Sequence, residues 1–342
     1  MGGSHTKRLT QLSLACLLSF SWSGLSVWGM DLTESFDETR LGGEKQGWWL
    51  DYDLEGQVLF NHNHRVVNKE NGVQLAAGLQ ARLRATSYRA LSEWRNELSI
   101  KQQFQREPVL SRWMNMMDEL ALDSLYFRKW KSRAPWGIFG RANLKTSLFS
   151  SFDDHTSAKT FEITERDGST ESVSTDRLRL SRSFQPLQFR ENLGLFYRPI
   201  ETSRSRLEIL LGGSLRQNLS KGQRVVSKSN SPPPDFLVNT LGNSYLAGAE
   251  AQLNFSGELK ELLNYELKAE WMMPFYDSAR PDDKSLLQRS SWLLGAEFRL
   301  ELLTWLRVVS ETRLWKEPQL QNRSQFLQAL SLRFGFSNET QL

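Results

Sequence analysis

The stretch Trp48-Trp49-Leu50-Asp51-Tyr52-Asp53-Leu54-Glu55-Gly56-Gln57-Val58-Leu59-Phe60 alternates apolar and polar residues along most of its length. Successive side chains of a β-strand point to opposite faces of the sheet. The stretch therefore predicts a strand with one apolar face, which holds Leu50, Tyr52 and Leu54, and one acidic face, which holds Asp51, Asp53 and Glu55.

The same alternation recurs at residues 73–89, 93–105 and 135–149. These candidate strands are much longer than the about 5–6 residues usual in globular proteins. Aromatic residues lie near the ends of several apolar faces: Trp48, Trp94, Trp136, Tyr245 and Trp292. Aromatic girdles flank the lipid-facing band of membrane barrels. The pattern predicts an all-β fold, a transmembrane antiparallel up-and-down β-barrel.

Fourteen such strands fit between residues 47 and 337. Twelve is the alternative, in which residues 158–184 form one long hairpin outside the barrel. Long gaps at 61–72, 106–116, 219–243 and 277–289 alternate with tight turns, which predicts longer extracellular loops and short periplasmic turns. The 219–243 gap holds the run Ser-Asn-Ser-Pro-Pro-Pro, so we expect it to be an exposed loop without a strand.

The composition agrees with a barrel that has a polar interior. Hydrophobic residues make up 39% of the 342 residues, less than the about 45–50% usual in globular proteins. After the N-terminal segment there is no apolar run of about 18 residues, which excludes a bundle of membrane-spanning helices. A formal net charge of +4 is too small to indicate nucleic-acid binding.

The first residues read as an export signal. Lys7 and Arg8 precede the short apolar core at 9–20, and Val27-Trp28-Gly29 fits a cleavage site, so we expect residues 1–29 to be a cleaved signal peptide. We expect residues 30–46 to form a short periplasmic segment, 47–337 the barrel and 338–342 a C-terminal tail. The single cysteine, Cys16, lies in the signal, so the mature chain is expected to have no disulfide or thiolate site.

The last predicted strand carries four apolar residues on one face: Leu330, Leu332, Phe334 and Phe336. This arrangement resembles the β-signal that the bacterial barrel-assembly machinery reads. The β-signal usually ends in a terminal Phe, whereas Ser337 to Leu342 follow Phe336 here. The resemblance implies that the assembly machinery is a partner during insertion.

Several short motifs together resemble an uncharacterised, porin-like family of bacterial outer-membrane β-barrels that is known only as a domain of unknown function. The motifs are Trp94-Arg95-Asn96-Glu97-Leu98, Asp118-Glu119-Leu120-Ala121-Leu122-Asp123-Ser124 with Tyr126, Lys145-Thr146, Phe184-Gln185-Pro186, Gly194-Leu195-Phe196-Tyr197-Arg198-Pro199 and Leu332-Arg333-Phe334-Gly335-Phe336. The resemblance implies a barrel in the bacterial outer membrane and supplies no catalytic residues.

The polar faces divide by charge when they are taken as the lumen. We expect a basic wall of Arg141, Lys145, Arg177, Arg179, Arg190, Arg206 and Arg216. We expect an acidic wall of Asp51, Asp53, Glu55, Glu250, Glu266, Glu270, Glu297 and Glu301. Two opposed walls would create a transverse field that sets the selectivity of a pore. The alternative is that these charges pair with one another and fill the interior.

Evidence for catalysis is thin, and we predict no enzyme, cofactor or metal site. Asp153-Asp154-His155 lies in a predicted outer loop, where a hydrolase at the barrel rim is the least favoured function. His62-Asn63-His64 offers only two imidazoles, too few for a metal site.

The function that this pattern favours is a porin-like channel for small polar solutes in the bacterial outer membrane. The alternative is a structural or adhesive protein that binds a partner through its extracellular loops, chiefly 219–243. The expected partners are outer-membrane lipids, the assembly machinery and small polar solutes, with no nucleic acid.

Overall fold

The computed structural model describes residues 46–63, 72–106, 113–202, 204–220, 222–229, 233–259, 262–278, 285–317 and 321–341. The predicted signal peptide and the predicted segment 30–46, apart from its last residue, lie outside the described residues.

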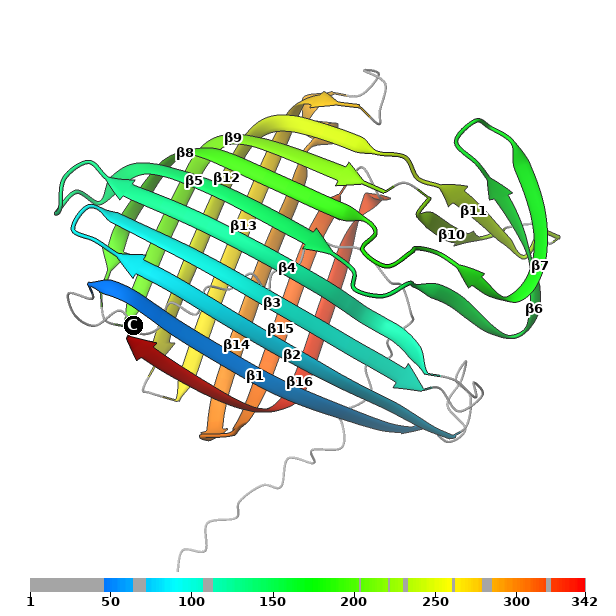
Figure 1. Ribbon diagram of the computed structural model, residues 1–342, viewed down its shortest axis with the longest axis horizontal. Coiled ribbons are helices and arrows are strands. Elements are labelled where there is room, and N and C mark those ends of the chain that lie inside the picture. Colours follow the sequence, from blue (N-terminus) through cyan, green and yellow to red (C-terminus); the bar gives the residue numbers. More distant parts are fainter. Residues whose placement is uncertain are drawn as a thin grey trace, which may run out of the picture.

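Twelve antiparallel strands close into a barrel in the order β1-β16-β15-β14-β13-β12-β9-β8-β5-β4-β3-β2 (Figure 1). Their bounds are β1 Gly47–Asn63, β2 Gly72–Tyr88, β3 Ser92–Arg106, β4 Met114–Lys129, β5 Trp136–Thr146, β8 Leu187–Glu201, β9 Ser205–Leu219, β12 Ser244–Leu259, β13 Leu263–Asp277, β14 Ser291–Leu303, β15 Leu306–Glu317 and β16 Gln321–Gln341. The predicted fold class is confirmed, and the strand count is twelve, the alternative, rather than fourteen.

The two ends of the barrel differ. One end, which we call the turn end, has connections as short as Leu303 to Leu306, and both the first and the last strand reach it. The other end, the loop end, carries the longer connections and two inserted hairpins. β16 runs on to Gln341, so residues 338–341 belong to the last strand and are not a tail. They continue the ladder because they pair with β1, in the register Trp49↔Gln341.

Four strands lie outside the barrel and form a sheet at the loop end, which we call the outer sheet (Figure 1). The strands are β6 Phe152–Thr164, β7 Thr170–Arg179, β10 Arg224–Lys228 and β11 Phe236–Thr240. Their order is β10-β11-β6-β7, and β11 pairs with β6 in parallel. The expectation that 219–243 lacks a strand is wrong, because β10 and β11 both fall inside this range.

The outer sheet has an apolar core of its own. Phe161, Ile163, Leu178 and Val238 are buried together, and Val226 and Phe236 pack against them. This core explains why β10 and β11 form although each has only five residues. Each five-residue strand brings an apolar side chain to the cluster. In an isolated loop that side chain would stay exposed to solvent.

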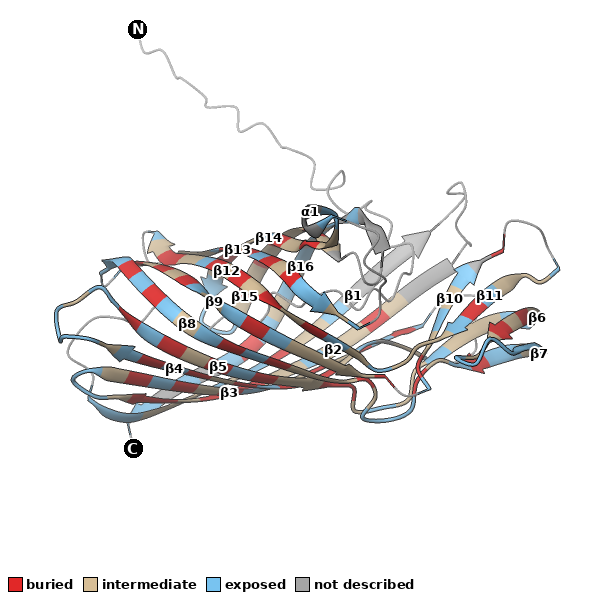
Figure 2. Ribbon diagram, turned by 90° about the horizontal axis from the view of Figure 1, so that it is seen from above, coloured by how far each residue is buried: buried red, intermediate tan, exposed pale blue. Residues whose placement is uncertain are grey.

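Burial alternates along the barrel strands, and the apolar side chains are on the outside. On β2, Leu79 and Leu83 are exposed whereas Arg82 and Arg84 are buried, and on β3 Leu98 is exposed whereas Glu97 is buried. Figure 2 shows this alternation as bands along the strands. A soluble barrel has the opposite arrangement, so the apolar outer face fits a lipid surround and the polar face lines the lumen.

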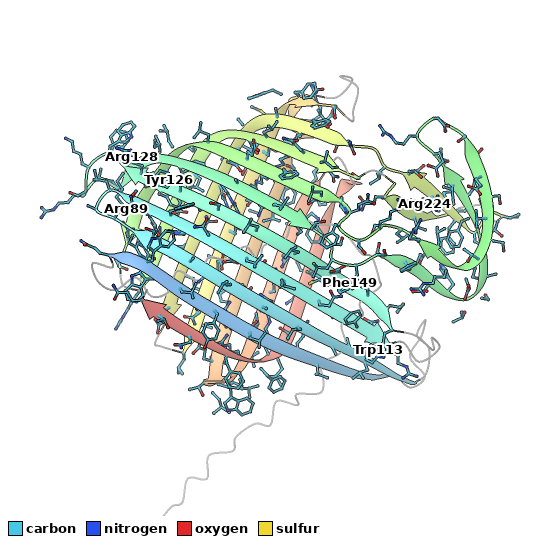
Figure 3. All side chains as sticks on the ribbon, viewed as in Figure 1. Arg89, Trp113, Tyr126, Arg128, Phe149 and Arg224 are labelled. Carbon is cyan, nitrogen blue, oxygen red and sulfur yellow. The ribbon has the colours of Figure 1, made fainter. Side chains whose placement is uncertain are left out.

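Exposed aromatic side chains lie at both ends of the outer face. Tyr126 marks the turn end, and Trp113 and Phe149 mark the loop end (Figure 3). Three aromatic pairs lie at or near the turn end: Trp48–Trp94, Trp130–Trp136 and Trp305–Phe334. Together they form two belts that border the apolar band.

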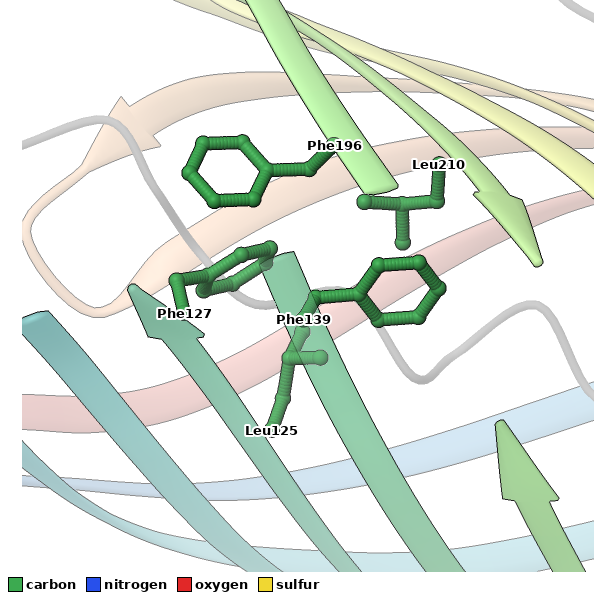
Figure 4. Packing of buried hydrophobic residues seen from close by; sticks show 5 residues of the cluster. All are labelled: Leu125, Phe127, Phe139, Phe196 and Leu210. Atoms are coloured by element: carbon green, nitrogen blue, oxygen red, sulfur yellow. The ribbon is translucent and has the colours of Figure 1, made fainter. Parts of the chain in front are cut away.

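One apolar cluster lies inside the lumen, near the turn end. It consists of Leu125, Phe127, Phe139, Phe196 and Leu210, which come from β4, β5, β8 and β9 (Figure 4). Phe127 and Phe196 meet edge to face, with 5.0 Å between ring centroids. The cluster thickens the wall on this side and narrows the lumen.

A short helix, α1 Leu286–Arg289, precedes β14. Among the residues that the structure describes, no helix is long and apolar enough to cross a membrane.

Candidate functional site

Five of the seven predicted basic-wall residues lie on inward-facing positions of the barrel. Arg141 and Lys145 are on β5, Arg190 is on β8, and Arg206 and Arg216 are on β9. The structure corrects the placement of Arg177 and Arg179, because both lie in β7 of the outer sheet. The reason is that β7 pairs with β6 and not with a barrel strand.

The predicted acidic-wall residues occupy inward-facing positions of barrel strands. Asp51, Asp53 and Glu55 are on β1, and the others follow on three adjacent strands: Glu250 on β12, Glu266 and Glu270 on β13, Glu297 and Glu301 on β14. β12 pairs directly with β9, so the basic and acidic sectors touch instead of facing each other across an open lumen. Opposite charges are therefore close enough to pair.

Near the turn end, five charged side chains form what we call the turn-end charge cluster. It consists of Glu93, Arg95, Arg198, Arg206 and Glu208. Arg198 contacts Glu93 at 2.8 Å and Glu208 at 2.7 Å, and Arg206 contacts Glu93 at 3.3 Å. β4, β5 and β8 separate β3 from β9 in the barrel, so the Glu93–Arg206 pair crosses the lumen.

Aromatic rings extend this cluster. The guanidinium carbon of Arg198 lies 4.1 Å from the ring centroid of Phe127, and that of Arg95 lies 5.0 Å from it. Cation–π contacts between desolvated groups are worth about 2 kcal/mol. The charged cluster and the apolar cluster of Figure 4 therefore form one packed body that fills part of the lumen.

Farther along the lumen is a second group, the central charge cluster. Its ion pairs are Arg190 with Glu250 and Glu270, Arg216 with Glu250, Lys268 with Glu270, and Arg141 with Asp123. Arg190 reaches Glu270 at 3.1 Å although β9 and β12 lie between their strands. Gln252 adds a hydrogen bond to Glu270 at 3.2 Å and links the cluster to Arg141 at 3.5 Å.

A third group lines the opposite side of the barrel. Glu55 of β1 accepts hydrogen bonds from Arg307 of β15 at 2.9 Å and from Arg333 of β16 at 3.2 Å. Arg84 of β2 pairs with Asp51 at 3.1 Å and with Glu97 of β3 at 3.2 Å.

The charged lining is buried. Arg206 is 2% exposed, Glu208 1%, Glu270 4% and Lys101 4%. In a wide water-filled pore such side chains would be exposed to solvent. The arrangement instead resembles a polar core, in which buried charges are paired and hydrogen-bonded.

Sequence reasoning did not single out Glu93, Arg95, Arg198 or Glu208 as site residues. The alternation rule places Arg95 on the polar face of its strand, so a signal for its inward position exists. Nothing in the sequence indicates that Glu93 pairs with Arg206, which is 113 residues away. That contact depends on the barrel order.

The Asp153-Asp154-His155 segment lies in β6 of the outer sheet. Nε2 of His155 is 3.1 Å from a carboxylate oxygen of Asp153, and its ring lies 4.9 Å from that of Phe236. Asp154 pairs instead with Arg177 at 3.4 Å. Within the described part of the chain, no group of three or more His, Cys, Asp or Glu side chains is suited to hold a metal ion. The ring of His155, on β6, thus packs against Phe236 of β11.

The four residues of the predicted assembly signal point outward from β16. Leu330, Leu332, Phe334 and Phe336 are all exposed on the apolar face. β16 closes the barrel by pairing with β1. Their recognition by the assembly machinery stays a prediction.

No family model matches the chain, and no curated protein matches it, so the predicted family membership stays a prediction. Solved structures similar to it include the β domain of the Bordetella autotransporter BrkA, at 10% identity and TM-score 0.37, covering 87% of this chain and 100% of that one. An outer membrane channel from Pseudomonas putida F1 has 6% identity and TM-score 0.40, over 90% of this chain and 100% of that one. The NanC porin has 9% identity and TM-score 0.34, over 86% and 99%.

Proposed function

We propose that this chain is an outer-membrane β-barrel with a closed lumen, and that it acts by holding the outer sheet at the cell surface to bind a partner. The observation that carries the proposal is the burial of the charged lumen lining, with ion pairs that cross the barrel.

The outer face supports a membrane location. Leu195 of β8 and Leu211 of β9 are in register and are 51% and 55% exposed. Exposing this apolar surface to water would be unfavourable in free energy, whereas exposing it to lipid is not. Strands cross a membrane only as closed barrels, because every backbone group must be paired. Bacterial barrels of this type have short turns on the periplasmic side, and this general pattern supports an extracellular position for the outer sheet.

The ion pairs support a closed lumen. Opening a path past the turn-end charge cluster requires separating Glu93 from Arg198 and Arg206, whose side chains are at most 11% exposed. Breaking a buried ion pair costs about 3–5 kcal/mol. Thermal motion alone does not supply this free energy for several pairs at once.

The outer sheet supports a binding role. Its core holds β6, β7, β10 and β11 together, so the surface it presents has a fixed shape. On the face opposite this core, Val225 and Leu237 are exposed, and Leu237 is in register with Glu162. An apolar area with a charged neighbour is suited to protein recognition.

Planar-bilayer recordings of the purified protein test the closed lumen. We expect no conductance steps from the wild type, and steps from the double variant Glu93→Gln/Glu208→Gln, because it removes both acids of the turn-end charge cluster. The control is Glu165→Gln, which breaks an ion pair with Arg224 in the outer sheet. Stable wild-type conductance would overturn the proposal.

A channel for small polar solutes is the second candidate. Asp51 favours it, because the side chain of this lumen-facing acid is 32% exposed while that of its partner Arg84 is 8% exposed. Any path would then follow β1, where acids dominate, and select cations. The same recordings distinguish the two candidates, since cation-selective steps from the wild type support the channel.

A further inference from the structure

A group of basic side chains lies at the turn end, on the outside of the barrel. We call it the cationic patch and define it as Arg89, Arg128, Lys131 and Arg133. Arg89 is in the β2–β3 turn, Arg128 is on the outer face of β4, and Lys131 and Arg133 are in the β4–β5 turn. All four are exposed. Figure 3 labels Arg89 and Arg128 beside Tyr126 at this end.

The backbone brings these residues together. Arg128 is in register with Ser92, three positions after Arg89, and the amide of Lys129 donates a hydrogen bond to the carbonyl of Leu91 at 2.7 Å. The two turns are therefore neighbours along the barrel rim.

Within the described segments, no acidic side chain pairs with these four charges. The adjacent Lys129, by contrast, contacts Glu201 at 2.9 Å. Within the part of the chain that the structure describes, the patch thus presents four positive charges at the surface.

Apolar and aromatic surface adjoins the charges. Trp130 and Trp136 have ring centroids 4.1 Å apart and are 51% and 45% exposed. Leu91, between the two turns, is also exposed. Indole rings favour the boundary between hydrocarbon and headgroups, so this belt fixes the depth of the patch in the bilayer.

The patch belongs to one sector of the barrel. The β14–β15 turn consists of Leu302, Leu303, Thr304 and Trp305 around the strand ends and carries no charge. The β8–β9 turn carries one exposed arginine, Arg204, so among the described turns at this end the exposed basic side chains are densest over β2 to β5. This density points to an anionic ligand.

We infer that the cationic patch binds the headgroup of an anionic phospholipid in the leaflet that surrounds the turn end. The phosphate oxygens accept hydrogen bonds from the guanidinium groups, and the acyl chains lie against Leu91, Trp130 and Trp136. A lipid fits better than an acidic protein, because Arg128 projects from the barrel wall toward the bilayer. The inference rests on the proposed membrane location.

Tryptophan quenching by brominated lipids tests the inference. The full chain is folded into vesicles that contain brominated phosphatidylglycerol or brominated phosphatidylcholine at equal mole fraction. We expect the relative binding constant of the wild type to favour phosphatidylglycerol by at least about fivefold, as expected for basic side chains near an anionic surface.

Two variants with equal charge changes separate the patch from a general charge effect. Arg89→Gln/Arg128→Gln/Lys131→Gln/Arg133→Gln should lose the preference. Arg106→Gln/Arg166→Gln/Arg179→Gln/Arg182→Gln, whose sites are exposed at the loop end, should keep it. An unchanged preference in the first variant, or a lost preference in the second, would overturn the inference.

Heat-modifiability on gels, measured on the same samples, separates the two proposals. A wild type that does not insert and fold contradicts the membrane location and the inference together. A wild type that folds but is quenched equally by both lipids contradicts only the lipid site.

Discussion

Replacing Glu208 by Gln tests whether the lumen is a buried polar core. Glu208 is 1% exposed and lies 2.7 Å from Arg198, 3.2 Å from Arg206 and 3.8 Å from Arg95. Gln keeps the size of the side chain and removes its charge. Three buried guanidinium groups then share only one carboxylate within the cluster, that of Glu93.

The expected loss is large because the environment is dry. Removing one partner of a buried ion pair costs about 3–5 kcal/mol, since the other charge stays uncompensated. We therefore expect Glu208→Gln to lower the free energy of unfolding by about 3–5 kcal/mol. The matched change Glu165→Gln breaks an ion pair whose side chains are 36% and 27% exposed. That change should cost no more than about 1 kcal/mol.

Urea titration of the protein in lipid vesicles, followed by tryptophan emission and by the gel shift of heated samples, measures both variants. The reasoning requires a clear separation between them. If Glu208→Gln unfolds within about 1 kcal/mol of the wild type, the cluster behaves as a hydrated surface pair. That result would refute the closed lumen as well.

Three more substitutions test other parts of the structure by the same unfolding assay. Leu211→Arg, at the middle of the lipid face of β9, should cost about 2–4 kcal/mol, and a neutral result would contradict the membrane location. Gly212→Ala should cost about 1–3 kcal/mol because its Cβ would overlap the carbonyl oxygen of Leu193, whereas a Cβ at Gly213 meets nothing nearby and Gly213→Ala should stay within about 0.5 kcal/mol. His155→Ala should remove about 0.5–1.5 kcal/mol of ring contact with Phe236 from the outer sheet, seen as faster proteolysis there, and unchanged proteolysis would speak against this packing.

The strands were predictable because alternation is a local property. The predicted strand 93–105 corresponds to Ser92–Arg106, and the first strand begins at residue 47 as expected. Two predicted strands, 158–166 and 171–184, exist in part but belong to the outer sheet. β7 has too few apolar residues at alternate positions for a lipid face, and that shortage was the available signal against barrel membership.

The short strands β10 and β11 were not predictable from a window of the chain. Each has five residues, and Pro233 and Pro234 lie between them. They form because Val238 is buried against Phe161, a contact made only once the sheet is assembled.

The sequence indicated which charged side chains face the lumen, but it did not indicate which of them pair. Alternation places Arg190 and Glu250 on the inner face, and both side chains are buried. The pairing of Arg190 with Glu270 reaches past β9 and β12, and strand order alone does not show that two side chains so far apart in the sheet come within contact distance. The prediction of a basic wall opposite an acidic wall assigned each charged side chain to a strand. It took no account of the distances between side chains inside the lumen.

The parallel pairing of β11 with β6 has a consequence for the order of folding. The amide of Thr160 donates a hydrogen bond to a carboxylate oxygen of Asp235, 75 residues further along the chain. Two strands of the barrel, β8 and β9, lie between these residues in the sequence. We therefore expect the two hairpins of the outer sheet to meet once β8 and β9 have paired with each other. An antibody specific for the folded outer sheet would then report the pairing of these two strands on living cells.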